Sequence, residues 1–182
     1  MSKVKMKREE LVKFYVAFKE FDQSVEPKFS FFITRNLQHL TDEFESAKAA
    51  EQATHPKPQF QEFQQKHLTL MREYVEFGTD GNPLIDATTR FIFKDGVGQV
   101  FEEKVDELTN LYTEDIALQE KAYDSLVEIM QEEIEIEVLQ IPYSLFPSTV
   151  HLGHDIHNLF TKYFCKDSME DIEKYIMSSI ES

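Results

Sequence analysis

Apolar residues recur every three or four positions through the first part of the chain, which is the period of an amphipathic helix. The pattern predicts helices over residues 8–23, 27–52 and 59–77. Only the short segment His55-Pro-Lys-Pro58 separates the last two helices, and prolines end helices. We therefore predict that residues 27–52 and 59–77 form a long antiparallel helical hairpin.

A pattern typical of β-strands begins after the turn-forming residues Gly78–Pro83. Short β-branched and aromatic runs predict a β-hairpin with strands near residues 83–86 and 90–94. Residues 132–139 alternate between acidic and aliphatic side chains, and a period of two is that of a strand with one buried face. Because an isolated hairpin is only marginally stable, we predict that these segments form a three-stranded antiparallel sheet.

Helical spacing is also found on both sides of this Glu-rich strand. It predicts helices over residues 97–112 and 113–131 before the strand, and C-terminal helices over residues 152–164 and 168–180 after it. The predicted fold class is mainly α with a small antiparallel β-sheet, that is, α+β.

Length and composition fit one folded unit. The chain has 182 residues, of which 41% are hydrophobic, and its 16 Phe and 7 Tyr are enough to fill a core. We expect residues 1–147 to hold the hairpin and the sheet. Residues 148–182 are expected to form a C-terminal helical extension of the same unit.

Cysteine usage and hydropathy indicate the compartment. Cys165 is the single cysteine, so no intrachain disulfide can form, and we expect a packed, unreactive thiol in a reducing environment. The basic start of the chain runs into Glu9 and Glu10 without the apolar stretch of a secretory signal. No run approaches the roughly 18 apolar residues of a membrane span. We expect a cytoplasmic protein that contacts no membrane.

The negative charge is concentrated in the second half of the chain. The formal net charge is −15; residues 1–100 hold 14 Lys and Arg against 15 Asp and Glu, whereas residues 101–182 hold 5 against 19. Such an acidic surface repels DNA phosphates, so we expect no direct binding of nucleic acid. Attraction of a basic partner and simple solubility both explain the acidity.

Three acidic residues of the predicted strand, Glu133, Glu135 and Glu137, lie on one face because strand side chains alternate. Paired carboxylates serve acid–base catalysis or hard cations, but a solvated strand face is the more ordinary explanation. We treat this row as a candidate interaction surface for a basic partner. The basic residues Lys3, Lys5, Lys7 and Arg8 are expected to form a frayed end or to touch the acidic half of a neighbouring copy.

Three histidines, His151, His154 and His157, form the one metal-like cluster of the sequence. Residues three apart share a helix face, but the third histidine is rotated by about 240° from the first, so one straight helix does not present all three to a metal. They are weak candidate ligands, and imidazoles that pack or lie in water are the simpler explanation. No phosphate-binding loop or nucleophile elbow is present, so we expect no cofactor.

Phe31 and Phe32 adjoin on a predicted helix and therefore cannot both face the core. The helical stripe of Phe residues around them is expected to be core. One of the two is expected to project outward, and Phe31 is the candidate contact residue for a protein partner.

Several short motifs, in a fixed order, carry a resemblance to known proteins. They are Phe31-Phe-Ile-Thr-Arg-Asn-Leu-Gln-His-Leu, Met71-Arg-Glu-Tyr-Val-Glu-Phe-Gly, Thr79-Asp-Gly-Asn-Pro, Val100-Phe-Glu-Glu-Lys-Val-Asp-Glu-Leu, and Glu133-Ile-Glu-Ile-Glu-Val followed by Ile141-Pro. In this order residues 27–147 resemble a family of small bacteriophage proteins known only as a domain of unknown function. The helix predicted over residues 113–131 and the tail 148–182 depart from that pattern.

The resemblance implies a phage origin and a role in infection or assembly, and it transfers no catalytic residue. We therefore expect a non-enzymatic phage protein that binds a virion component or a host protein, in the host cytoplasm or in the virion. Association with further copies of the chain is also open. Two alternatives remain: an acidic DNA mimic that inhibits a host nuclease or DNA-binding protein, and a metal-dependent enzyme that uses the histidine cluster.

Overall fold

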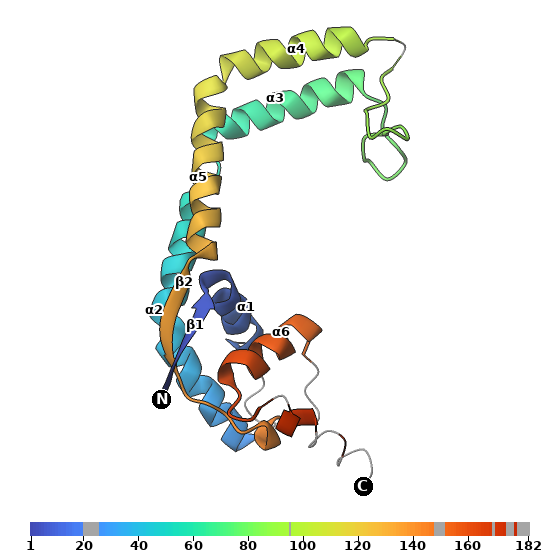
Figure 1. Ribbon diagram of the computed structural model, residues 1–182. Helices are drawn as coiled ribbons and strands as arrows, with labels where there is room; N and C mark the ends of the chain where they lie inside the picture. Colours follow the sequence, from blue (N-terminus) through green and yellow to red (C-terminus); the bar gives the residue numbers. More distant parts are fainter. Residues whose placement is uncertain (20–25, 95, 148–151, 169, 174–176, 178–182) are drawn as a thin grey trace. The chain divides into compact units, whose positions relative to one another are not determined.

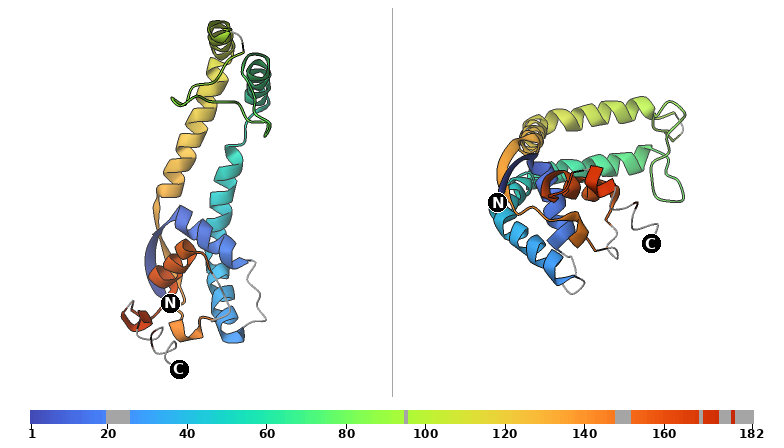
Figure 2. Two further views of the ribbon diagram at one scale, coloured as in Figure 1. Left: turned by 90° about the vertical axis from the view of Figure 1, so that its right-hand side faces the viewer. Right: turned by 60° about the horizontal axis from the view of Figure 1, so that its bottom comes forward.

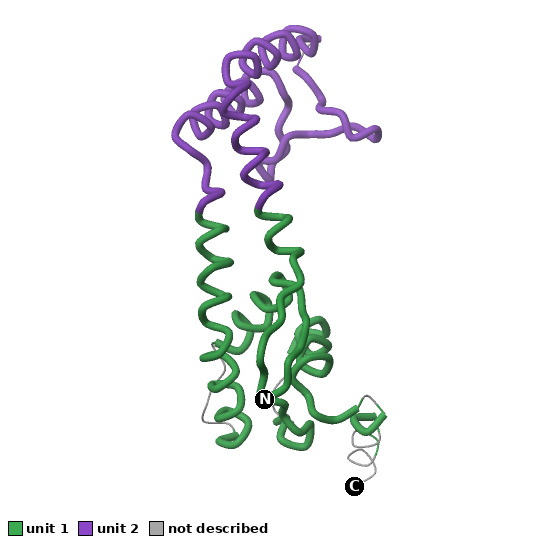
Figure 3. The backbone as a smooth tube through the Cα atoms, turned by 60° about the vertical axis from the view of Figure 1, so that its left-hand side comes forward, with its two compact units in different colours: residues 1–52, 126–182 green, residues 53–125 purple. Residues whose placement is uncertain are grey.

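The computed structural model describes residues 1–19, 26–94, 96–147, 152–168, 170–173 and 177. It divides into two compact units: unit 1 comprises residues 1–52 and 126–182, and unit 2 comprises residues 53–125 (Figure 3). Unit 2 is therefore inserted in the sequence between the two halves of unit 1.

The structure is mainly helical, as predicted, and most helices form close to their expected bounds (Figure 1). Unit 1 holds α1, most of α2, the end of α5, the 3₁₀ turn η1 and α6; unit 2 holds α3, α4 and the beginning of α5. The bounds are α1 Arg8–Lys19, α2 Pro27–Ala53, α3 Pro58–Tyr74, α4 Gly98–Leu111, α5 Thr113–Gln131, η1 Tyr143–Leu145 and α6 His154–Leu159. Proline begins both α2 and α3, where its fixed φ suits the first helical turn.

The sheet of unit 1 has two strands among the described residues, not the three that we predicted. β1 (Ser2–Lys7) pairs antiparallel with β2 (Glu133–Val138), so that Met6 lies opposite Ile134 and Lys5 opposite Glu135. The first residues of the chain, expected to fray, alternate between lysine and an apolar or small residue. Their apolar side chains therefore join the inner face of β2, and their lysines face its glutamates.

The predicted β-hairpin forms in unit 2, but the segment that pairs beside it is not the one that we predicted. Ile85 pairs with Phe91, but the neighbouring segment is the stretch directly after α3 rather than β2. Three backbone hydrogen bonds close a ring: the Glu76 amide donates to Ile92, the Ile92 amide to Leu84, and the Leu84 amide to Glu76, at 2.8–2.9 Å. This pairing ends the third helix earlier than predicted, because residue 75 is already extended.

The core of unit 1 is built largely from phenylalanine. Phe14 of α1 stacks on Phe164 with ring centroids 3.6 Å apart, and Phe18 lies 6.3 Å from Phe29 of α2. Phe160 contacts both Phe18 and Phe29, and all five rings are at most 1% exposed. Tilted aromatic contacts such as those of Phe160 with Phe18 and Phe29 add to the free energy of area burial.

The C-terminal segment belongs to this core. The predicted helix 152–164 is two elements, α6 and the π-helical turn η2 (Phe160–Phe164), which closes with a hydrogen bond from the Cys165 amide to the Phe160 carbonyl. α6 packs on α1, and Ile172 is 2% exposed within the same core. Described residues on both sides of the boundary that we predicted at residue 147 therefore belong to one core. At Ser168 the Asp171 amide donates to the Ser168 hydroxyl, the contact of an N-cap residue, and that hydroxyl donates to the Asp171 carboxylate.

Unit 2 contains an antiparallel helix pair, α3 and α4, which lie side by side (Figures 1 and 2). Phe101 of α4 contacts both Tyr74 of α3 and Phe93 of the hairpin, with ring centroids 6.3 and 5.3 Å away. α2 lies almost wholly in unit 1, so its predicted hairpin with residues 59–77 stays a prediction, and the helix pair of unit 2 is α3 with α4.

A buried amide ties α2 to the end of β2. Asn36 is fully buried; its Nδ2 donates to the Leu139 carbonyl at 2.9 Å, and its Oδ1 accepts from the Leu139 amide at 2.7 Å. The side chain thus takes the place of a neighbouring strand at residue 139. It satisfies two backbone groups that would otherwise be buried without partners.

Replacing Asn36 by alanine is expected to lower the free energy of unfolding by about 2 kcal/mol, because both backbone groups of the half-buried Leu139 lose their partner. Urea unfolding followed by circular dichroism measures this. His39→Ala, an exposed position of the same helix, is the control and should change the free energy by less than about 0.5 kcal/mol. Equal effects of the two substitutions would contradict the assigned role.

Candidate protein-binding surface

The acidic row of β2 faces lysines of its own chain. In the strand register Glu133 lies opposite Lys7, Glu135 opposite Lys5, and Glu137 opposite Lys3. Lys3 Nζ also lies 2.7 Å from Glu135 Oε1, a contact that raises the pKa of Lys3 and lowers that of Glu135. The three carboxylates remain exposed, but the outer face of the sheet carries as many positive as negative charges. This pairing reduces the attraction that the row offers to a basic partner.

Exchanging charges between the facing Lys and Glu residues of β1 and β2 tests this pairing. Glu135→Lys is expected to lower the urea midpoint of unfolding, because it adds a fourth lysine to a face that already holds Lys3, Lys5 and Lys7. The double variant Lys5→Glu/Glu135→Lys should recover most of the loss. The matched control Glu45→Lys, at an exposed position of α2, should show no such loss. Salt at 0.5 M should shrink the difference, and a double variant as weak as the single one would refute the pairing.

The histidines do not converge. His157 Nε2 lies 3.1 Å from the Tyr143 hydroxyl, whereas His154 Nε2 lies 3.1 Å from Asn158 Nδ2. His151 lies outside the described residues. Among the described residues, no group of three or more His, Cys, Asp and Glu side chains is placed to hold a metal ion. The two described imidazoles thus bind separate neighbours within their own unit.

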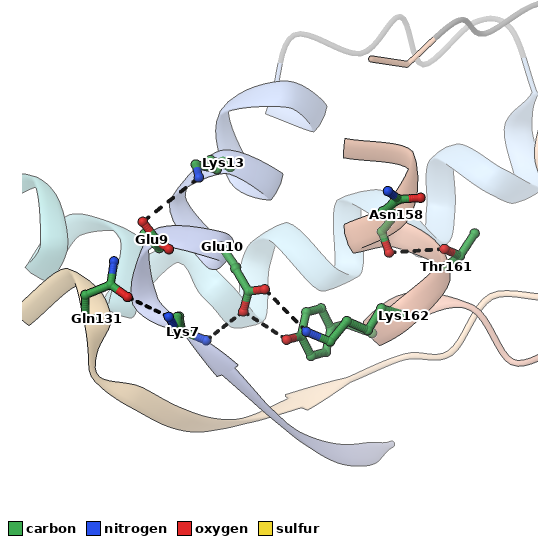
Figure 4. Close-up of polar contacts among 9 residues, drawn as sticks. Lys7, Glu9, Glu10, Lys13, Gln131, Asn158, Thr161 and Lys162 are labelled. Atoms are coloured by element: carbon green, nitrogen blue, oxygen red, sulfur yellow. Dashed lines mark hydrogen bonds and ion pairs between the residues drawn. The ribbon is translucent and has the colours of Figure 1, made fainter. Parts of the chain in front are cut away.

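A carboxylate, a phenol and an amine meet at the start of α1, a cluster that we did not predict. Glu10 Oε2 accepts from the Tyr163 hydroxyl at 2.9 Å and from the Lys7 amide at 2.9 Å, and Lys162 Nζ lies 3.4 Å from Glu10 Oε1 (Figure 4). Lys162 and Tyr163 lie more than 150 positions from Glu10 in sequence, so no local motif could reveal the cluster.

The electrostatics of this cluster suit a structural role. Burial raises the pKa of Glu10, but the hydrogen bonds from the Lys7 amide and Tyr163 outweigh it, and the net pKa lies below the usual range. Burial raises the pKa of Tyr163, and the contact with Tyr163 raises that of Lys162. The carboxylate therefore stays ionised and both donors stay protonated, so at neutral pH neither donor is poised to act as a base or nucleophile. Glu10 caps α1 and joins it to η2.

The Glu10 cluster predicts a pH dependence. A carboxyl whose pKa is lowered by folding stabilises the protein above the unfolded pKa of about 4.5, and this contribution is lost as the pH falls through the lower folded pKa. The difference in urea midpoint between wild type and Glu10→Gln should therefore be clear at pH 6 and nearly absent at pH 3. Glu9→Gln, its neighbour in the first turn, is the control. An unchanged difference at both pH values would contradict the assignment.

Cys165 is buried, as expected, and burial raises the pKa of its thiol. The thiolate is the reactive form of cysteine, so a raised pKa lowers its reactivity. Phe31 is 60% exposed on α2, while Phe32 packs partly against the core, so Phe31 is the one that projects outward. The two rings meet edge to face with centroids 5.9 Å apart.

Unit 2 leaves more apolar surface in water than our sequence analysis anticipated. α3 and α5, every residue of which is described, bury no side chain fully. In the described part of unit 2, the fully buried apolar side chains are Val75, Phe101 and Tyr112. The apolar stripe predicted for the third helix does form on one face, but its members are only half-buried. On α3 they are Phe60, Phe63, His67, Leu70, Met71 and Tyr74, whereas Phe77 lies beyond the end of the helix.

Large apolar side chains of unit 2 are also openly exposed. Leu111 at the end of α4 is 71% exposed, Tyr123 of α5 61%, and Ile85 of the hairpin 56%. Beside Leu111, the side of α3 and α4 forms an open groove of about 530 Å³ with Leu70 and Leu108 in it. The sequence contained a signal for this surface: the apolar stripes of α3, α4 and α5 are too many for a unit with so few elements to bury them.

No protein-family model, curated protein or solved structure matches this chain. The described helices also include none that is both long and apolar enough to cross a membrane. The assignment of function therefore depends on the residues themselves.

Proposed function

We propose that this chain is a non-enzymatic protein that acts by binding another protein through unit 2. The observation that carries the proposal is the incomplete burial of the apolar stripes on α3, α4 and α5. Fully burying a Leu, Ile or Phe side chain contributes roughly 1.5–3 kcal/mol. Covering several half-exposed side chains at once is thus enough to drive association, even after the entropic cost of docking.

The resemblance of residues 27–147 to small phage proteins supports a phage origin for this binding function. The partner is then a component of the virion, an assembly factor or a host protein. Both a location in the host cytoplasm and a place in the particle fit this proposal.

The two alternatives have less support from the arrangement of side chains. Glu133, Glu135 and Glu137 lie opposite lysines, so this row is a poor imitation of a phosphate backbone. His154 and His157 bind different neighbours, which weakens a metal-dependent mechanism based on them.

Capture of the partner by matched variants tests the proposal. The tagged full chain is produced in infected host cells, and bound proteins are quantified by mass spectrometry. We expect the unit 2 double variant Leu111→Glu/Tyr123→Glu to capture at least ten-fold less of the partner than the wild type does. Val16→Glu/Met177→Glu adds the same charge at exposed apolar positions of unit 1 and should retain it.

Equal recovery by both variants would overturn the proposed surface. Turnover by the purified chain on a panel of hydrolase and nuclease substrates would overturn the non-enzymatic assignment. Mass spectrometry of purified particles then distinguishes a virion component, present at a fixed copy number, from a binder that acts inside the cell.

A further inference from the structure

The groove on the side of α3 and α4 has an aliphatic floor. Leu70 of α3 and Leu108 of α4 are half-buried in it, and Leu111 closes its end with most of its surface exposed. Val100 lies eleven residues before Leu111, so it shares the same face of α4. Between Val100 and Leu108 this face carries Lys104 and Glu107, so the apolar floor lies toward the C-terminal end of α4.

The two lysines of the groove are already engaged by their own unit. Lys66 Nζ lies 2.8 Å from Glu62 Oε1 and 2.8 Å from the Tyr112 hydroxyl. Lys104 Nζ lies 5.2 Å from the centroid of the Tyr74 ring, a cation–π distance. Both lysine charges are thus directed at side chains of α3 and at Tyr112.

The carboxylates around the groove outnumber these lysines. On α4, Glu107 and Glu103 lie one turn apart beside the groove, whereas Glu102 and Asp106 lie on the opposite side of the helix. Glu62 of α3 is already paired with Lys66. Glu107 lines the groove, and both Glu107 and Glu73 of α3 lie close enough to Lys104 to act on it electrostatically. Residues 53–125 together hold 7 Lys and Arg against 14 Asp and Glu, a net charge of −7. The groove thus combines an apolar floor with a negative surround.

We propose that this groove binds a basic amphipathic helix of a partner protein. A helix with aliphatic residues at positions i, i+3, i+4 and i+7 fills the floor, and the Lys and Arg that flank such a stripe meet the carboxylates of α4. α4 has 14 residues, about 21 Å at 1.5 Å per residue, so three to four turns of the partner helix match its length. This inference rests on the proposed function and names the chemistry of the partner.

Charge argues against a second copy of this chain as the occupant. Two copies of unit 2 would bring net charges of −7 together, and the carboxylates of one α4 would face those of the other. A helix rich in Lys and Arg removes this repulsion and replaces it with attraction.

A designed peptide tests the inference on the full chain. The probe is a fluorescent 18-residue helical peptide of Leu and Lys with Leu at i, i+3, i+4 and i+7, and fluorescence anisotropy reports its binding. One control peptide carries Glu in place of Lys, and a second has the Leu/Lys composition in an order without a helical stripe. We expect the first peptide to bind at least ten-fold more tightly than either control.

Variants locate the binding. Leu111→Lys/Glu107→Lys is expected to weaken binding of the Leu/Lys peptide at least ten-fold. The matched pair Leu118→Lys/Glu114→Lys, at exposed positions of α5 outside the groove, is expected to weaken it less than two-fold. Equal losses would show attraction to the general charge of unit 2 and would overturn the inference. So would equal binding of the scrambled peptide, or a stable dimer of the chain that Leu111→Lys/Glu107→Lys dissolves.

The peptide assay and the capture experiment fail in different ways. If the unit 2 variant loses its cellular partner but the Leu/Lys peptide does not bind, the proposed function stands and the basic helix is wrong. If the captured partner is unaffected by that variant, binding through unit 2 is itself wrong.

Discussion

The pairing of β1 with β2 is the constraint on which unit 1 depends. It joins residues 2–7 to residues 133–138, so the chain must return to its own beginning after more than 120 residues. Met6 and Ile134 then enter the same core, and Asn36 of α2 continues the hydrogen bonding where β2 ends. α1 starts directly after β1, and its cap, Glu10, reaches the C-terminal turn η2. Chain segments from both ends are therefore fixed to one two-stranded sheet.

The two units differ in how far they bury their apolar side chains and in how far their charges are balanced. Unit 1 buries a continuous aromatic core and balances the acidic row of β2 with lysines of β1. Unit 2 leaves its helical stripes half-covered, and α4 keeps its excess of carboxylates. The apolar part of this surface is costly to leave in water, and exposed apolar patches mark sites of interaction. This contrast is the physical basis of the proposal that unit 2 is the part that binds a partner.

Local patterns in the sequence predicted local structure well. The period of 3.6 residues predicted α2 and α5 almost to the residue, and the alternation of residues 132–139 predicted β2. The alternation of residues 2–7 was equally clear, but its lysines suggested a solvated end. The sequence could not predict the partner of each strand, because β1 and β2 lie so far apart along the chain. Nothing in residues 90–94 excludes β2 as a neighbour either.

The candidate site was predicted only in part, for a related reason. The outward position of Phe31 follows from its neighbour on the helix, and that prediction was correct. The engagement of Glu135 by Lys3 and of Glu10 by Tyr163 depends on tertiary contacts that no spacing encodes. The helical stripe of α3 was visible in the sequence, but a pattern shows which residues share a face and not how fully that face is covered.

The core of unit 1 contains side chains from residues 1–52 and 126–182 alone, as far as the structure describes it. Residues 53–125 can therefore change without opening a cavity in that core. Under the proposed function, the insertion separates selection for recognition from selection for folding. A lineage under pressure from a changing partner is free to vary α3, α4 and the hairpin between them, while the paired ends of the chain keep the protein folded.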